Sequence, residues 1–234
     1  MIKNWLIILI IGIITSYSKP VDKQLDLSKA TILISPTIKS PVNETAKEIL
    51  LEEIEKRTSL QLSIGDNWNN NTIIALAITG EKELYGEAVT NSSGKNLPEL
   101  NKEGFRIFHE NRNGKDILWI TGADSRGVLF GIGKLLRTAD MQDHQITITN
   151  KIDISTSPEY ALRGHQFGYR STANSWDSWT VEQFEQQFRE QVLFGANSFE
   201  NIPFQDSLSS VHFKIAPQEM EVRLSEICNK YDAD

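Results

Sequence analysis

Cysteine is almost absent from this sequence: among 234 residues only Cys228 carries a thiol, so the chain forms no internal disulfide. Without disulfides, a domain is stabilised by its core, which predicts a sizeable packed domain rather than a small disulfide-stapled fold. Cys228 itself is predicted to be a buried structural thiol rather than a nucleophile. It belongs to an apolar helix face that also contains Met220, Leu224, Ile227 and Tyr231.

Basic charge is scarce as well. The 24 Lys and Arg residues are outnumbered by 31 Asp and Glu, for a formal net charge of −7, so the chain lacks the basic surface that nucleic-acid binding needs. Histidine is scattered: His109, His144 and His212 show no i, i+4 arrangement, which excludes a typical metal site. His165, inside a predicted strand, is expected to be a packed or hydrogen-bonded core residue.

The glycines of the sequence do not have the spacing of a phosphate-binding loop. The stretch "GVLFGIGK" resembles a phosphate-binding loop, but five residues rather than four separate Gly127 from Gly133. Leu135 also stands where a serine or threonine should bind Mg²⁺. Small residues that let a helix lie close to a sheet explain the pattern better. We therefore expect neither a nucleotide nor any other cofactor.

Long apolar runs occur only at the start. Lys3 precedes "LIILIIGIIT", and small residues follow before Pro20, which predicts a signal peptide over residues 1–18 with cleavage after Ser18. The alternative is a membrane anchor, for which the run is shorter than the roughly 20 residues of a spanning helix. The mature chain is therefore expected to be periplasmic or extracellular and not bound to a membrane.

Residues 25–155 alternate strand and helix patterns and predict a small α/β sheet domain with its helices packed on one face. One helix is expected at 40–59, with Ser40 as N-cap and Pro41 at the first helical position. A second is expected at 123–139, capped by Asp124. The turn "NRNGK" predicts a hairpin. The expected strands are 30–35, 60–64, 72–78, 104–110, 116–122 and 145–149.

Residues 160–234 repeat strand and helix twice. Thr180 and Gln183 predict a capping box for the first helix, and Trp179 is expected to pack on Phe184 as a hydrophobic staple. A parallel sheet needs both faces covered, and a (β/α)₈ barrel needs about 250 residues. This part therefore predicts the first two βα units of an incomplete (β/α)₈ TIM barrel, at the front of a longer protein. The expected strands are 161–169 and 195–204, and the expected helices are 180–194 and 216–231.

Two motifs together resemble a group of bacterial exported glycoside hydrolases, the β-hexosaminidases of family 20 and the α-glucuronidases of family 67. They are "DSRGVLFGIGKLLR" (124–137) and "SPEYALRG" (157–164). The resemblance implies a non-catalytic α/β domain followed by a catalytic barrel, whose catalytic carboxylates would lie beyond Asp234. It matches Arg163 to an arginine that binds sugar hydroxyls in the hexosaminidases. Gly168 stands where their first strand ends in aspartate, which argues against hexosaminidase specificity.

The residues also predict a carbohydrate cleft on their own chemistry. Ligand contacts of such barrels lie at carboxyl ends of strands and in the following loops. Pyranose rings suit aromatic planes flanked by arginine, amide and carboxylate groups. The predicted substrate-binding residues are Arg163, Tyr169, Arg170, Trp176, Asp177, Glu200 and Asn201.

Alternatives stand beside these assignments. Arg163, at a strand start, is equally typical of a structural ion pair. Glu200 is a single carboxylate, whereas glycoside cleavage uses a pair. Two classes of function therefore remain: the N-terminal portion of a secreted glycoside hydrolase acting on a carbohydrate substrate, or a non-enzymatic carbohydrate-binding or accessory module. The end of the chain at the point where a third strand would begin favours the first.

Overall fold

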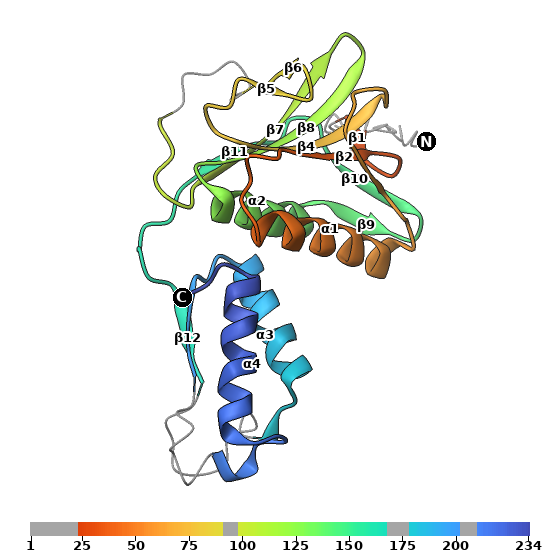
Figure 1. The fold of residues 1–234 in the computed structure, drawn as a ribbon. Coiled ribbons are helices and arrows are strands. Elements are labelled where there is room, and N and C mark those ends of the chain that lie inside the picture. Colours follow the sequence, from red (N-terminus) through yellow and green to blue (C-terminus); the bar gives the residue numbers. More distant parts are fainter. Residues whose placement is uncertain (1–22, 91–97, 168–177, 202–209) are drawn as a thin grey trace, which may run out of the picture.

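The computed structural model describes residues 23–90, 98–167, 178–201 and 210–234. Figure 1 shows two bodies stacked end to end: an upper body, residues 23–156, and a lower body, residues 163–234. Because the expected signal peptide lies outside the described residues, the structure does not bear on it. Within the described part, no helix is both long and apolar enough to cross a membrane.

A mixed six-stranded sheet forms the centre of the upper body, in the order β11-β7-β8-β4-β2-β3. Pairing is parallel from β8 through β4 and β2 to β3, and antiparallel where β7 and β11 extend the other edge. Helices α1 (Val42–Thr58) and α2 (Ser125–Thr138) pack on one face (Figure 1), which confirms the predicted α/β fold. The strands are β2 (Thr31–Ile34), β3 (Ser63–Gly65), β4 (Thr72–Ile78), β7 (Phe105–Arg112), β8 (Lys115–Gly122) and β11 (Asp153–Thr156).

Strand β4 is apolar at almost every position because both faces of the sheet are covered. Ile74 and Leu76 belong to the core on the helix side, whereas Ile73 belongs to a second core on the opposite face. The short hairpin of β5 (Glu83–Leu84) and β6 (Glu87–Ala88) lies over that opposite face (Figure 1). Trp68 fastens it there, since its indole N–H donates to the carbonyl oxygen of Leu84 at 2.8 Å.

The β7–β8 hairpin and the N-terminal cap of α2 are both present, as their local sequence patterns predict. The β7–β8 turn places Asn113 and Gly114 at φ 53° and 84°, the left-handed values that a two-residue turn between twisted strands requires. At the start of α2, the Asp124 carboxylate accepts from the backbone N–H of Gly127 at 2.8 Å. A Cβ on Gly131 would lie 2.5 Å from Cγ2 of Ile120 in β8, so this glycine does let the helix approach the sheet.

Two predictions about local structure were wrong. Helix α1 begins at Val42, and its N-cap position is held by Pro41 rather than by the predicted Ser40; no side-chain cap bond forms, because proline has no side-chain acceptor. Residues 145–149 form β10 (Gln145–Thr149), which does not join the central sheet. It pairs instead with β1 (Gln24–Asp26) and, through a tight turn, with β9 (Asp140–Gln142).

The lower body has the predicted order of two βα units. Strands β12 (Gly164–Gln166) and β13 (Ser198–Glu200) are parallel, and α3 (Val181–Leu193) and α4 (Pro217–Lys230) follow them, with a 3₁₀ turn at Ser210–His212. The capping box at Thr180 is present, and the Trp179 and Phe184 rings lie 5.4 Å apart, as the staple predicts. The rings of Phe188 and Phe199 stack in the core of the lower body, with their centres 4.1 Å apart.

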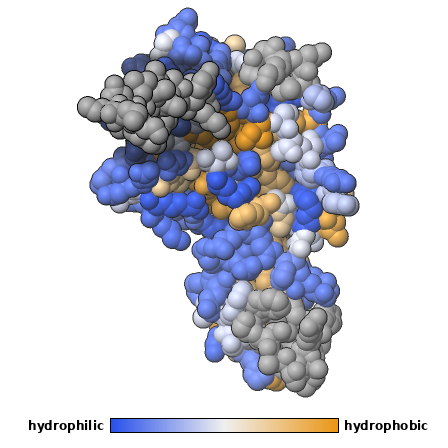
Figure 2. Space-filling model, turned by 180° about the vertical axis from the view of Figure 1, so that it is seen from behind, coloured by the Kyte–Doolittle hydropathy of each residue, from blue (hydrophilic) through white to orange (hydrophobic). Residues whose placement is uncertain are grey.

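Seen from behind, apolar surface gathers on the upper body and around its junction with the lower body, while polar surface covers most of the rest (Figure 2). The large apolar side chains that are most exposed include Tyr160 and Leu162, in the segment that connects the two bodies, and Phe194, directly after α3. The guanidinium of Arg137 lies 4.3 Å from the centre of the Phe194 ring, which gives this aromatic a cation–π partner from α2.

Candidate functional site

The carboxyl ends of β12 and β13 meet at one edge, as the cleft prediction requires. Their parallel register pairs Gln166 with Glu200, so the last residues of the two strands lie side by side. Glu200 is exposed there. Asn201 follows it half-buried, and its side-chain oxygen has no hydrogen-bond partner among the described residues. Two polar groups that could accept or donate to sugar hydroxyls therefore share this edge.

Four predicted contacts fall on the segment between β12 and α3. Tyr169, Arg170, Trp176 and Asp177 lie outside the described residues, so their contribution to the cleft stays a prediction.

Arg163 lies at the opposite end of β12 from Glu200, and its guanidinium is fully engaged. Nε donates to the carbonyl oxygen of Gly195 at 2.8 Å and Nη1 to that of Tyr160 at 2.7 Å. Nη2 bonds to a carboxylate oxygen of Glu103 in the upper body at 2.5 Å. The structural ion pair that the sequence left open is therefore present, and direct sugar contact by Arg163 stays a prediction.

Glu103 is the centre of this junction, and sequence reasoning missed it. Its side chain is 4% exposed and also accepts from Arg126 at 2.8 Å and from the Asn197 amide at 3.1 Å. Burial opposes its charge, but hydrogen bonds from Arg163 and Asn197 and the charges of both arginines hold the pKa of Glu103 below its ordinary value. No local pattern marks this residue, because its partners lie 23, 60 and 94 residues away.

Glycine again permits a close approach at the junction. A Cβ on Gly133 of α2 would lie 2.0 Å from the carbonyl oxygen of Leu193, at the end of α3. Arg137, one turn later, donates to the same oxygen. The glycine pattern that resembles a phosphate loop therefore serves helix packing, both against the sheet and against the lower body.

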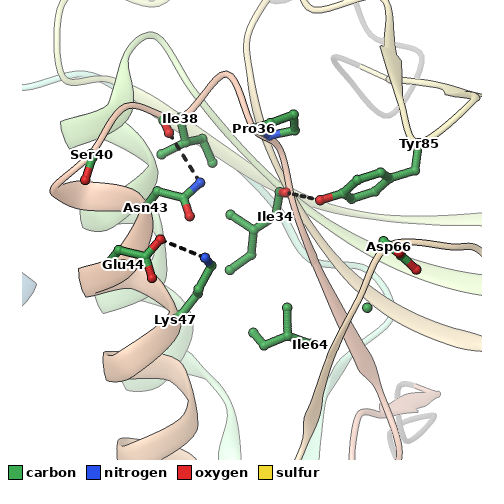
Figure 3. Close-up of a pocket in the computed structure, with 11 residues that line it drawn as sticks. Ile34, Pro36, Ile38, Ser40, Asn43, Glu44, Lys47, Ile64, Asp66 and Tyr85 are labelled. Carbon is green, nitrogen blue, oxygen red and sulfur yellow. Dashed lines mark hydrogen bonds and ion pairs between the residues drawn. The ribbon is translucent and has the colours of Figure 1, made fainter.

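A separate hollow of about 680 Å³ lies in the upper body, beyond the carboxyl ends of β2 and β3 (Figure 3). The first turns of α1 form one wall, with Asn43 and the ion pair of Glu44 and Lys47, whose charged atoms are 2.9 Å apart. Tyr85, from the β5–β6 turn, forms the other wall and donates its hydroxyl to the carbonyl oxygen of Ile34 at 2.9 Å. No residue here was predicted as a site.

Cys228 and His165 are packed as structural residues. Burial, with a smaller effect of the Asp234 charge, raises the pKa of the Cys228 thiol to about 11, so it stays protonated at neutral pH. The ring of His165 packs edge-on against Phe167, with ring centres 5.0 Å apart. Among the described residues, no group of three or more histidine, cysteine, aspartate or glutamate side chains is placed to hold a metal ion.

Comparison with known proteins identifies a fold rather than a sequence family. No protein-family model matches this sequence, and no curated protein is significantly similar to it. Solved structures do match: CpGH84B has a TM-score of 0.61 at 15% identity and covers 92% of this chain. The family GH115 4-O-methyl-α-glucuronidase BtGH115A has a TM-score of 0.58 at 18% identity and covers 91%. The N-acetyl-β-hexosaminidase of Streptomyces plicatus has a TM-score of 0.57 at 12% identity and covers 92%.

The fold therefore resembles that of the N-terminal portion of glycoside hydrolases. The chain spans 34%, 29% and 42% of the lengths of these three structures, respectively. A GH20 exo-β-N-acetylglucosaminidase from Vibrio harveyi, solved with N-acetylglucosamine, matches with a TM-score of 0.52 at 16% identity. The GH84 and GH115 likenesses extend beyond the two families that the sequence motifs resemble, while the GH20 likeness agrees with them.

Proposed function

We propose that this chain is the N-terminal part of an exported glycoside hydrolase. The upper body is its non-catalytic α/β domain, and the lower body forms the first two βα units of a (β/α)₈ catalytic domain. The observation that carries the proposal is the structural likeness, which spans 91–92% of the chain, and so both bodies, in GH20, GH84 and GH115 enzymes. The catalytic carboxylate pair is expected on strands that follow.

Within that enzyme, the edge shared by β12 and β13 forms one wall of the sugar cleft. The exposed carboxylate of Glu200 and the amide oxygen of Asn201, which is buried and has no hydrogen-bond partner among the described residues, support this location. Tyr169, Arg170, Trp176 and Asp177 belong to the same proposed wall, where an indole would cover a sugar ring. For Arg163 the geometry favours a positioning role, since its bond to Glu103 fixes the start of β12.

The test uses the protein expressed from its gene together with any sequence that follows position 234. Hydrolysis of chromogenic β-N-acetylglucosaminides and α-glucuronides is measured for that protein and for Trp176→Ala. Because stacking is felt in the ground state and the transition state alike, this substitution should chiefly raise KM. Tyr160→Ala, at another exposed aromatic, should leave kcat and KM unchanged. Saccharide binding without turnover would instead favour the accessory carbohydrate-binding module, and the absence of both would reject the proposal.

Export is the second part of this proposal. Cleavage after Ser18 should yield a mature chain that begins at Lys19, recovered outside the cytoplasm. N-terminal sequencing of the fractionated protein checks this, and an intact Met1 in the membrane fraction would show the anchor instead.

A further inference from the structure

We propose that the hollow in Figure 3 is a binding site for a neutral saccharide, separate from the cleft proposed at β12 and β13. It goes beyond the proposed function, because it lies in the body assigned no catalytic role. Its volume of about 680 Å³ is in the range of small-molecule sites. It lies where open α/β sheets bind ligands, beyond the carboxyl ends of parallel strands, here β2 and β3.

The hollow combines an apolar floor with a polar rim. Ile34 and Ile38 are buried in the floor, and Ile64 of β3 leaves 38% of its surface exposed beside them. Asn43 and Asp66 lie on the rim (Figure 3). An apolar base edged by amide and carboxylate groups complements a pyranose ring, which has C–H faces and a belt of hydroxyls.

Asn43 is held in place with its acceptor available. Its amide nitrogen donates to the carbonyl oxygens of Ser35 and Ile38, at 3.2 and 3.3 Å, so its orientation is fixed. The side-chain oxygen points into the space between α1 and β2 (Figure 3). A fixed acceptor of this kind can take a hydrogen bond from a hydroxyl without first losing side-chain freedom.

Tyr85 supplies an aromatic wall at a backbone position that does not favour tyrosine. It has φ 47° and is followed by Gly86 at 82°, the pair of left-handed residues in a tight hairpin turn. Asparagine or glycine is the usual choice at the first of these positions, so a tyrosine there is strained. The ring is 41% exposed at the hollow, and its hydroxyl is anchored on Ile34. Because Tyr85 has a strained backbone and a fixed, exposed ring, we infer that the ring contacts a ligand.

The charges of the lining select among ligand classes. Lys47 is neutralised by Glu44, which leaves the carboxylate of Asp66 as the uncompensated charge of the lining, so an anion is disfavoured. A divalent cation is also unsuited, because the described residues contain no cluster of three metal-ligating side chains. A neutral, hydroxyl-rich molecule satisfies both the floor and the rim.

Tyr85→Asn tests the site without an obvious folding defect. Asparagine suits the left-handed position, which offsets the loss of the hydroxyl bond, so the melting temperature should stay close to that of the unaltered chain. Chitobiose and cellobiose are titrated into the purified chain by calorimetry, with ligand-detected NMR as the second measurement. At least one should bind, and Tyr85→Asn should weaken it tenfold or more. Asp66→Ala should weaken it as well.

The matched control is Tyr160→Ala, which removes an exposed tyrosine that is not part of the lining of the hollow and should leave affinity unchanged. Failure of both disaccharides to bind would overturn the proposal. So would binding that survives Tyr85→Asn but is lost in Trp176→Ala, a result that would place the sugar at β12 and support only the proposed function. Competition by inorganic phosphate or glucuronate would overturn the assignment to a neutral ligand.

Discussion

At the scale of single residues, Glu103 shows how a buried carboxylate can keep its charge. It accepts hydrogen bonds from two arginines and an amide, and these outweigh the loss of hydration on burial. Two of those partners, Arg163 and Asn197, belong to the start of β12 and the approach to β13. One carboxylate of the upper body therefore sets where both strands of the lower body begin.

Glu103→Gln should destabilise the protein by about 3 kcal/mol, because it leaves Arg126 and Arg163 without their buried counter-charge. Urea unfolding followed by tryptophan fluorescence measures the change. Glu44→Gln is the control, since it breaks an exposed pair and should cost about 0.5 kcal/mol or less. Equal effects of the two substitutions would show that the Glu103 pairs contribute no more than surface pairs.

The same residue predicts a pH dependence. The folded pKa of Glu103 lies below its ordinary value of 4.5, so its contribution to stability is complete above that pH. The contribution is lost as the pH falls from 4.5 through the folded pKa. Unfolding free energies of the unaltered protein and of Glu103→Gln should therefore differ most at neutral pH and converge in acid. A difference that stays constant from neutral pH to pH 3 would contradict this.

Part of the candidate site could be predicted from the sequence. The strand-end positions of Glu200 and Asn201 followed from the βα pattern, because a strand end is a local property. The binding partners of Arg163 did not, since Glu103 is 60 residues away and only the packed fold brings them together. The sequence around Tyr85 does contain a local signal: "LYGE" carries a tyrosine where a hairpin turn usually has asparagine.

At the scale of elements, signals within a few residues of a boundary predicted most of the structure. The β7–β8 turn, the Asp124 cap and the Thr180 capping box each depend on bonds spanning three or four residues, and all three are present. The sheet that β10 joins was predicted wrongly, because the central sheet and the neighbouring strand β9 are alternative partners for this strand. The turn to β9 is short, and pairing with the nearer strand closes a smaller loop.

Helix α2 gives an element-scale prediction at Gly133. Replacing a helical glycine by alanine usually stabilises a protein by about 0.5–1 kcal/mol. Here the new Cβ would lie 2.0 Å from a backbone oxygen of Leu193, which cannot move aside as a flexible side chain could. Gly133→Ala should therefore destabilise the protein by roughly 2 kcal/mol or more, through overpacking.

Thermal unfolding measures this change, with Thr138→Ala as the control at an exposed position of the same helix. That control should shift stability by about 0.5 kcal/mol or less. A more stable Gly133→Ala protein would mean that α2 and α3 do not approach each other in solution as closely as this packing requires.

At the scale of the whole molecule, the lower body depends on the upper one. Two parallel strands of three residues each bury little surface alone, and parallel sheets need cover on both faces. Polar contacts join the bodies along α1 as well as at Glu103. The hydroxyl of Thr45 donates to the carbonyl oxygen of Lys230 at 2.6 Å, and the Lys230 ammonium lies 2.7 Å from Glu48.

Arg189 makes two further contacts with α1 and gives the last prediction. From α3 it reaches Glu52 at 2.5 Å and Glu53 at 3.2 Å, with only 10% of its side chain exposed. Arg189→Ala removes one of the two cations that pair with the buried Glu53, the other being Arg57, and breaks these contacts between α3 and α1. Because the apolar core of the lower body is continuous with that of the upper body, loosening the contact between α3 and α1 should let the lower body open locally while the upper body stays folded.

Hydrogen exchange followed by mass spectrometry separates the two bodies. In Arg189→Ala, amides of α3 and α4 should exchange at least tenfold faster, which corresponds to about 1.4 kcal/mol of lost protection. Amides of β4 and β8 should change much less, since the central sheet keeps both of its cores. Arg223→Ala, on an exposed pair within α4, should leave both sets unchanged. Equal acceleration in the sheet and in α3 would mean that the two bodies unfold as one unit, and that the lower body has no separate opening for Arg189 to control.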